Sequence, residues 1–163
     1  MKVGIIQSNY IPWRGYFDFI DDVDVFIYYD DVHYSKNSWR NRNKIKNANG
    51  TSWVTVPVEF SLSSEKKNVE DIKISYRQNW QDKHVKSIGQ AYSKTPFFSH
   101  YSEELFDMIG QKFEYLSELN VNINNWIMKQ LGIDTIIRMS SEYNACGAKT
   151  ERLIDLLKKV GAT

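Results

Sequence analysis

Residues 1–30 combine two short apolar runs with a helix-like segment between them, and this order limits the folds open to the chain. Residues 3–6 and 23–29 are rich in β-branched and aromatic side chains, which is typical of buried strands. Between them, residues 13–20 place apolar side chains at helical spacing and follow Pro12, which the first turn of a helix tolerates. Together they predict a βαβ unit, whose strands are parallel and whose crossover is right-handed.

The remaining sequence extends this pattern. We expect strands over 52–58, 71–74 and 135–139, helices over 79–92, 101–109, 113–131 and 149–160, a long loop over 33–49 and a charged connection over 61–68. The prediction is one α/β domain over residues 1–163, with a Rossmann-like, open and mainly parallel sheet that has helices on both faces. Because Gly161 follows the last helix where a strand would ordinarily come next, we also expect a truncated domain whose C-terminal strand or strands are missing.

Composition excludes several classes of protein. The formal net charge is only +1, so no overall basic field favours DNA or RNA as a partner. Cys146 is the single cysteine, which excludes an intrachain disulfide and a cysteine-cluster zinc site. No apolar run reaches the ~18 residues of a membrane span or the ~7–15 residues of a signal-peptide core. We therefore predict a cytoplasmic protein without a transmembrane segment.

Polar and aromatic side chains follow the first predicted strand. Open α/β folds bind ligands at the carboxyl ends of their strands, so this segment is a candidate substrate site. The candidates are Gln7, Asn9, Tyr10 and Trp13. Under the competing interpretation, Ser8 or Asn9 only caps the following helix while the aromatic rings pack on the sheet.

A second candidate segment is sharply polarised in charge. Residues 18–31 contain six aspartates and no Lys or Arg, whereas residues 32–46 contain five basic residues and no acidic ones. Arginines suit phosphates, asparagines suit hydroxyl groups, and a tryptophan stacks on a sugar or base. The substrate-binding candidates here are Trp39, Arg40, Asn41, Arg42, Asn43 and Lys44. The alternative is a solvated basic loop that the aspartates neutralise.

Acid–base candidates lie beside this segment. Asp30 and Asp31 end the second predicted strand, where a carboxylate can act as a general base or share Mg²⁺ with a diphosphate. His33 follows them in the polar loop and is the histidine best placed for proton transfer. No His and Cys spacing indicates a dedicated metal site. We interpret His84 as a helix-face histidine, and Cys146 has no neighbouring base that would make it a nucleophile.

These residues resemble the WbqC-like protein family of bacteria. The matching blocks are residues 6–18, 30–32, 39–43, 53–58, 83–84, 90–92, 96–98 and 149–153. The family takes its name from O-antigen gene clusters, so the resemblance implies a part in making or decorating a surface polysaccharide such as lipopolysaccharide. His33 departs from the pattern, which commonly has glutamine there, and family members typically continue beyond the position of Thr163 with a further strand.

Two functional hypotheses follow. The first is a small-molecule transferase or ATP-dependent ligase that modifies a nucleotide-linked or lipid-linked sugar, for example by acylating an amino sugar. The arrangement of residues 3–30 loosely resembles α/β nucleotidyltransferases and adenylate-forming ligases, which would imply ATP near residues 7–15. ATP or an acyl donor with Mg²⁺ are the cofactors considered. The second hypothesis is a non-catalytic module that binds a glycan precursor or docks on a partner glycosyltransferase.

Overall fold

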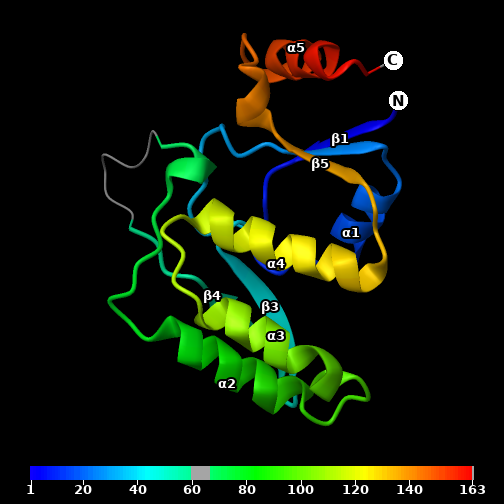
Figure 1. Ribbon diagram of the computed structural model, residues 1–163. Helices are drawn as coiled ribbons and strands as arrows, with labels where there is room; N and C mark the ends of the chain where they lie inside the picture. Colours follow the sequence, from blue (N-terminus) through cyan, green and yellow to red (C-terminus); the bar gives the residue numbers. More distant parts are fainter. Residues whose placement is uncertain (60–66, 163) are drawn as a thin grey trace.

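The computed structural model describes residues 1–59 and 67–162 and contains a small parallel β-sheet (Figure 1). The strand order is β1 (Val3–Ile6), β2 (Val25–Tyr28) and β5 (Ile136–Met139), with all neighbours parallel. In the register, Val25 pairs with Val3 on one side and with Ile136 on the other. Helix α1 (Arg14–Asp21) connects β1 and β2, so the predicted parallel βαβ unit is confirmed.

Helices cover both faces of this sheet, as predicted. Because successive strand residues point to opposite faces, Phe26 and Tyr28 pack with α1 and with Met128 of α4 (Leu116–Leu131). On the other face, Ile27 packs against Leu156 of α5 (Lys149–Val160). The central strand β2 is buried along its whole length, which explains its continuous apolar sequence.

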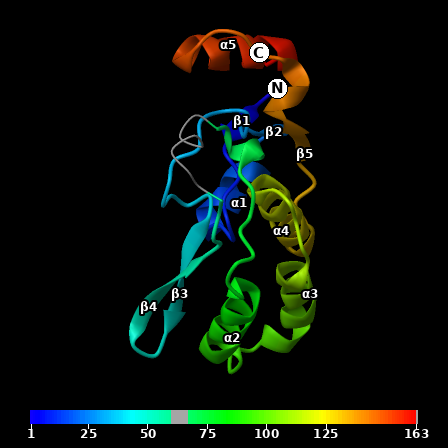
Figure 2. The same ribbon diagram turned by 90° about the vertical axis from the view of Figure 1, so that its left-hand side faces the viewer.

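A second hydrophobic core lies beyond α4, away from the sheet. An antiparallel hairpin of β3 (Arg42–Asn47) and β4 (Gly50–Thr55) packs there with α2 (Trp80–Tyr92) and α3 (Phe98–Gly110). Figure 2 shows the hairpin, α2 and α3 on the side of the molecule away from α5. Leu116, Leu119 and Ile123 of α4 are fully buried in this second core. Helix α4 therefore separates the two cores and contributes side chains to both.

The structure corrects two of the predicted elements. The expected loop over residues 33–49 contains strand β3, whose charged sequence suits a solvated hairpin face: the Arg42 guanidinium lies 4.3 Å and the Lys44 ammonium 5.0 Å from the Trp53 ring centroid. The expected strand over 71–74 is absent from the described residues, because that segment forms the 3₁₀ helix η2 (Val69–Asp71) and isolated bridges. Most of the connection predicted over 61–68 lies outside the described residues.

The other helices and strands follow the predictions to within a few residues. The 3₁₀ helix η3 (Ser140–Tyr143) follows β5 and leads to α5. Across residues 1–59 and 67–162, we find no helix whose length and apolar character would let it cross a bilayer.

A buried histidine ties the segment after β1 to the second core. The His84 Nε2 lies 3.1 Å from the Thr55 carbonyl oxygen, which can only accept, so Nε2 carries the proton. Nδ1 then accepts a hydrogen bond from the Tyr10 hydroxyl at 2.9 Å. Burial lowers the pKa of His84 to about 4, so the imidazole is neutral at pH 7.

Protonation of His84 should therefore weaken the fold. Its folded-state pKa lies below the ordinary 6.5, so its contribution to the free energy of unfolding is present above pH 6.5 and declines towards pH 4. The decline reaches at most about 1.4 kcal/mol per pH unit. We expect His84→Gln, which keeps a neutral donor and acceptor, to lose stability less steeply than the wild type over this range in urea unfolding. Parallel pH profiles for the two proteins would contradict this assignment.

Candidate functional site

The carboxyl ends of β1 and β2 meet at a buried carboxylate. Asp30, two residues past β2, is fully buried. One of its oxygens accepts a hydrogen bond from the backbone N–H of Ser8 at 2.8 Å, and the other accepts one from the Ser117 hydroxyl. Asp30 therefore joins the segment after β1 to the first turn of α4.

Helix α4 presents a polar stripe to this carboxylate. Ser117, Asn120 and Asn124 are spaced by three and four residues, so they share one face of the helix, and all three are buried. The Asn120 amide donates to the Ser8 hydroxyl at 3.2 Å and to the Arg40 carbonyl at 2.8 Å. Asn124 donates to the Asn9 carbonyl at 3.3 Å. We call the side chains of Ser8, Asp30, Arg40, Ser117, Asn120 and Asn124 the buried polar cluster.

The electrostatics of the cluster centre on Asp30 and Arg40. Burial raises the pKa of Asp30, and the hydrogen bonds from Ser117 and Ser8 and the charge of Arg40 oppose that rise. Burial likewise lowers the pKa of Arg40, which Asp30 opposes. Three enclosed atoms of the cluster, the Arg40 Nε, the Asn120 Oδ1 and the Asn124 Oδ1, have no hydrogen-bond partner in the described part of the chain. The cluster thus holds polar groups whose bonding capacity the fold does not use.

A small pocket lies between the two segments that this cluster connects. It has a volume of about 300 Å³, and we call it the tryptophan pocket. Its lining residues are Asn9, Pro12, Trp13, Trp39 and Asn43. Trp13 is 69% exposed and Trp39 is 49% exposed, so both indoles offer accessible ring surface. Such surfaces stack on sugars and bases.

The backbone beside this pocket has an unusual conformation. Ile11 has a φ of 43°, in the left-handed region that β-branched residues rarely adopt. The Asn43 side-chain amide donates to the carbonyls of Tyr10 at 3.3 Å and Ile11 at 2.5 Å, which holds this turn in place. A Cβ on Gly15 would lie 2.2 Å from the Trp13 ring, so only glycine there permits the observed indole position. Strained backbone of this kind is common in ligand-binding segments.

A second cavity, of about 590 Å³, lies past the end of β2, and we call it the Asp31 cavity. Asp31 pairs with Arg152 of α5 at 2.6 Å and accepts a hydrogen bond from the Ser140 hydroxyl. His33, Lys149 and Arg152 line the cavity with Asp31, as do Tyr29, Val32, Asn68, Gly147, Ala148, Thr150 and Leu153. The cavity therefore combines a carboxylate, an imidazole and two cationic side chains.

The predicted site residues are divided between these two places. Asp30 and Asp31 lie in different surroundings, because Asp30 binds Ser117 of α4 whereas Asp31 binds Arg152 of α5. In the described part of the chain, no three His, Cys, Asp or Glu side chains gather as metal ligands would. Asp31 and His33 border the Asp31 cavity, whereas Asp30 has no exposed surface.

Several predicted substrate-binding side chains serve the fold. Tyr10 is fully buried against His84, so the structure removes its side chain from the proposed pocket. Asn41 is also buried and donates to the Val56 carbonyl at 3.0 Å. Arg42 and Lys44 lie over Trp53 rather than in either cavity. The backbone carbonyl of Gln7 accepts a hydrogen bond from the Tyr16 hydroxyl at 3.0 Å, which fixes the main chain there and leaves the Gln7 side chain unassigned.

Sequence reasoning missed the partners that α4 and α5 supply. Ser117, Asn120 and Asn124 lie beside the apolar stripe of α4, and their shared helical spacing was the available signal. Arg152 lies in the family-like block 149–153, but its contact with Asp31, like that of Ser140 in η3, depends on how the chain returns to Asp31.

These features define an α/β protein with a pocket and a cavity at the carboxyl edge of a small parallel sheet. The chain belongs to the WbqC-like protein family, whose pattern matches residues 7–163. It is 40% identical over 163 residues to a Mycobacterium tuberculosis protein described as uncharacterized protein Rv1507c, and the match covers 99% of this chain and 70% of that protein. No solved structure matches the chain.

The hydrogen bonds of Asp30 predict different outcomes for two substitutions. Asp30→Asn can still accept from the Ser8 N–H and can donate to the Ser117 hydroxyl, so we expect it to fold. Asp30→Ala leaves the Ser8 N–H without its partner and should lower the free energy of unfolding by about 1–3 kcal/mol. Urea unfolding at pH 7 measures both values.

The pH dependence provides the control for this comparison. Because burial raises the pKa of Asp30, its ionisation costs stability as pH rises from the ordinary value of 3.8 through the folded-state value. The free energy of unfolding of the wild type should therefore fall as pH rises through this range, and that of Asp30→Asn should not. Identical pH profiles, or an Asp30→Ala protein as stable as the wild type, would contradict the role assigned to Asp30.

Proposed function

We propose that the chain is a small-molecule transferase that modifies a nucleotide-linked or lipid-linked amino sugar during synthesis of a bacterial surface polysaccharide. The observation that carries the proposal is the Asp31 cavity, where an ionisable carboxylate and two cationic side chains border a space of about 590 Å³. Membership of the WbqC-like family supports the polysaccharide context, because the family is named after O-antigen gene clusters. A cytoplasmic location would suit such a substrate.

The cationic side chains of the cavity suit a phosphorylated substrate. Arg152 and Lys149 border the cavity near the first turn of α5, whose free N–H groups add positive potential. The guanidinium of Arg152 also donates to the backbone carbonyl of Asp31 at 3.1 Å. The carboxylate and the backbone carbonyl of Asp31 therefore together fix the position of the guanidinium. A diphosphate of a nucleotide sugar is a suitable partner for this pair of cations.

The proposed reaction is acyl transfer to the amino group of the sugar. The amine nitrogen attacks the carbonyl carbon of an acyl donor, a C–N bond forms, and the bond to the leaving group breaks with its electron pair. The nitrogen loses one proton, for which Asp31 is the proposed acceptor because its carboxylate borders the cavity. Asp30, being enclosed, takes the role of a positioning residue that orders the segments around the tryptophan pocket.

The test measures acylation of a nucleotide-linked amino sugar by acyl-coenzyme A, with product detected by mass spectrometry. Asp31→Asn should lower turnover by about 10²–10⁴-fold, because a general base contributes that much to such reactions, while substrate binding persists. Asp134→Asn is the matched control, since Asp134 is exposed and precedes β5 at the opposite edge of the sheet. Undiminished turnover of Asp31→Asn would remove the proposed base.

One observation favours a second function, that of a non-catalytic module for a glycan precursor or a partner glycosyltransferase. The rings of Trp39 and Trp53 are in contact, with centroids 5.4 Å apart and planes tilted by 39°, and both are about half exposed. An exposed aromatic pair flanked by cations is typical of an interaction surface. Under this function, Trp39→Ala would abolish partner or glycan association, and no acyl donor would give turnover.

A further inference from the structure

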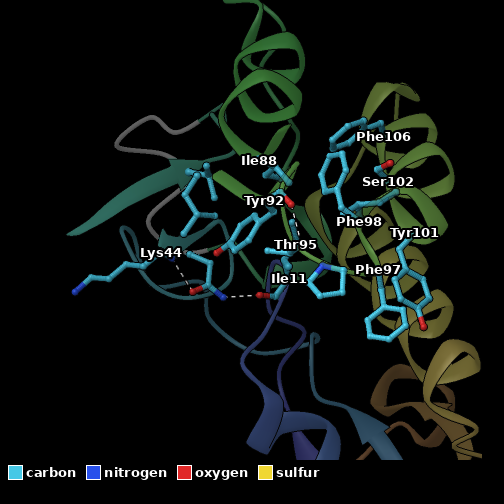
Figure 3. A pocket seen from close by; sticks show the side chains of 15 residues that line it. Ile11, Lys44, Ile88, Tyr92, Thr95, Phe97, Phe98, Tyr101, Ser102 and Phe106 are labelled. Atoms are coloured by element: carbon cyan, nitrogen blue, oxygen red, sulfur yellow. Dashed lines mark hydrogen bonds between the residues drawn. The ribbon is translucent and has the colours of Figure 1, made fainter. Parts of the chain in front are cut away.

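An apolar groove lies beside the tryptophan pocket, and Figure 3 shows the side chains that line it. Its volume is about 410 Å³, and it runs between the end of α2 and residues 98–106 of α3. Ile88 and Tyr92 line one wall, while Phe98, Leu105 and Phe106 line the other. Phe97 is 74% exposed at its margin. This volume lies in the range of small-molecule sites.

Several polar groups around the groove already have partners in the protein. The Tyr92 hydroxyl accepts a hydrogen bond from the Lys46 N–H at 3.0 Å, and the Thr95 hydroxyl donates to the Tyr92 carbonyl at 2.7 Å. The Asn43 amide is engaged by the carbonyls of the Ile11 turn. The Lys44 side chain extends away from the groove (Figure 3). The lining is mainly apolar, so burial here costs an apolar ligand less than it costs a polar one.

We propose that this groove binds a medium-length hydrocarbon chain, such as that of a fatty acyl group. Water occupies about 30 Å³ in the liquid and a methylene group is of similar size, so the groove holds roughly a dozen methylene-sized groups. That capacity fits a medium-length fatty acyl chain and is far too small for a long polyprenyl chain. Asn43 lines both the groove and the tryptophan pocket, which places the end of such a chain beside the tryptophan pocket.

This inference goes beyond the proposed function, because the groove and the Asp31 cavity share no lining residue. The experiment fills the groove with an indole. Ser102 lies on the α3 wall, so Ser102→Trp places the new ring within the space of the acyl chain. Ser99→Trp is the matched control, because Ser99 lies on the same helix, is exposed and does not line the groove. The probes are decanoate and farnesyl phosphate, and the readouts are isothermal titration calorimetry and thermal shift on the 163-residue chain.

We expect decanoate to bind the wild type and Ser99→Trp equally, and to bind Ser102→Trp at least about tenfold more weakly, because the indole occupies the apolar volume. Leu105→Ala, which enlarges the groove, should shift the preferred chain length upward from decanoate. Equal decanoate binding by both Trp variants would overturn the inference. Binding of farnesyl phosphate by a wild type that does not bind decanoate would also overturn the inference. The same holds if the wild type self-associates and Ser102→Trp dissociates it, because the groove would then be an interface between copies of the chain.

Nucleotide-sugar binding separates this inference from the proposed function. If decanoate does not bind but a nucleotide-linked amino sugar does, and Asp31→Asn still abolishes its modification, the groove assignment fails and the transferase stands. If decanoate binds in the groove but no sugar substrate is ever modified, the transferase fails. The groove is then a fatty-acyl site of a binding module.

Discussion

The carboxylate of Asp30 connects parts of the chain that are far apart in sequence. Its two oxygens bind the backbone after β1 and the first turn of α4, and both bonds lie in the protein interior. A buried carboxylate is costly unless such bonds compensate it, so the surrounding structure must hold Ser8 and Ser117 in place. The position of the segment after β1, and with it the tryptophan pocket, follows from this constraint.

Helix α4 connects the Asp30 carboxylate to both hydrophobic cores of the molecule. One face of the helix is apolar and completes the second core, while the neighbouring face carries Asn120 and Asn124 to the two segments around the pocket. The helix thereby aligns the parallel sheet with the β3–β4 hairpin. The site between them depends on both cores, although none of its lining residues belongs to α4.

The sequence predicted the elements whose signals are local. The apolar runs of β1 and β2 and the amphipathic α2, α4 and α5 follow from periodicity, and the carboxyl edge of the sheet follows from the βαβ order. Strand β3 was not predicted, because its alternating cations are stabilised by Trp53 on the partner strand rather than by burial. The expectation of further C-terminal strands stays a prediction.

The sequence predicted which chain segments form the candidate site, but it did not predict which side chains contact one another there. Asp30 and Asp31 are neighbours in sequence, and nothing local indicates that one joins α4 while the other joins α5. Similarly, Tyr10 resembles a surface residue of a polar segment until His84 is seen to bind it. These assignments depend on long-range packing, which a single sequence does not encode in any short pattern.

Amide hydrogen exchange in the Asn120→Leu protein tests the central claim most directly. The substitution keeps the size of the side chain but removes its bonds to Ser8 and to the Arg40 carbonyl. We predict faster exchange of the Tyr10 amide, which donates to the Trp39 carbonyl across the pocket, with little change in β2. Exposed Asn122→Leu is the control. Unchanged exchange at Tyr10, or equal acceleration throughout the protein, would contradict the claim that the buried polar cluster holds the pocket together.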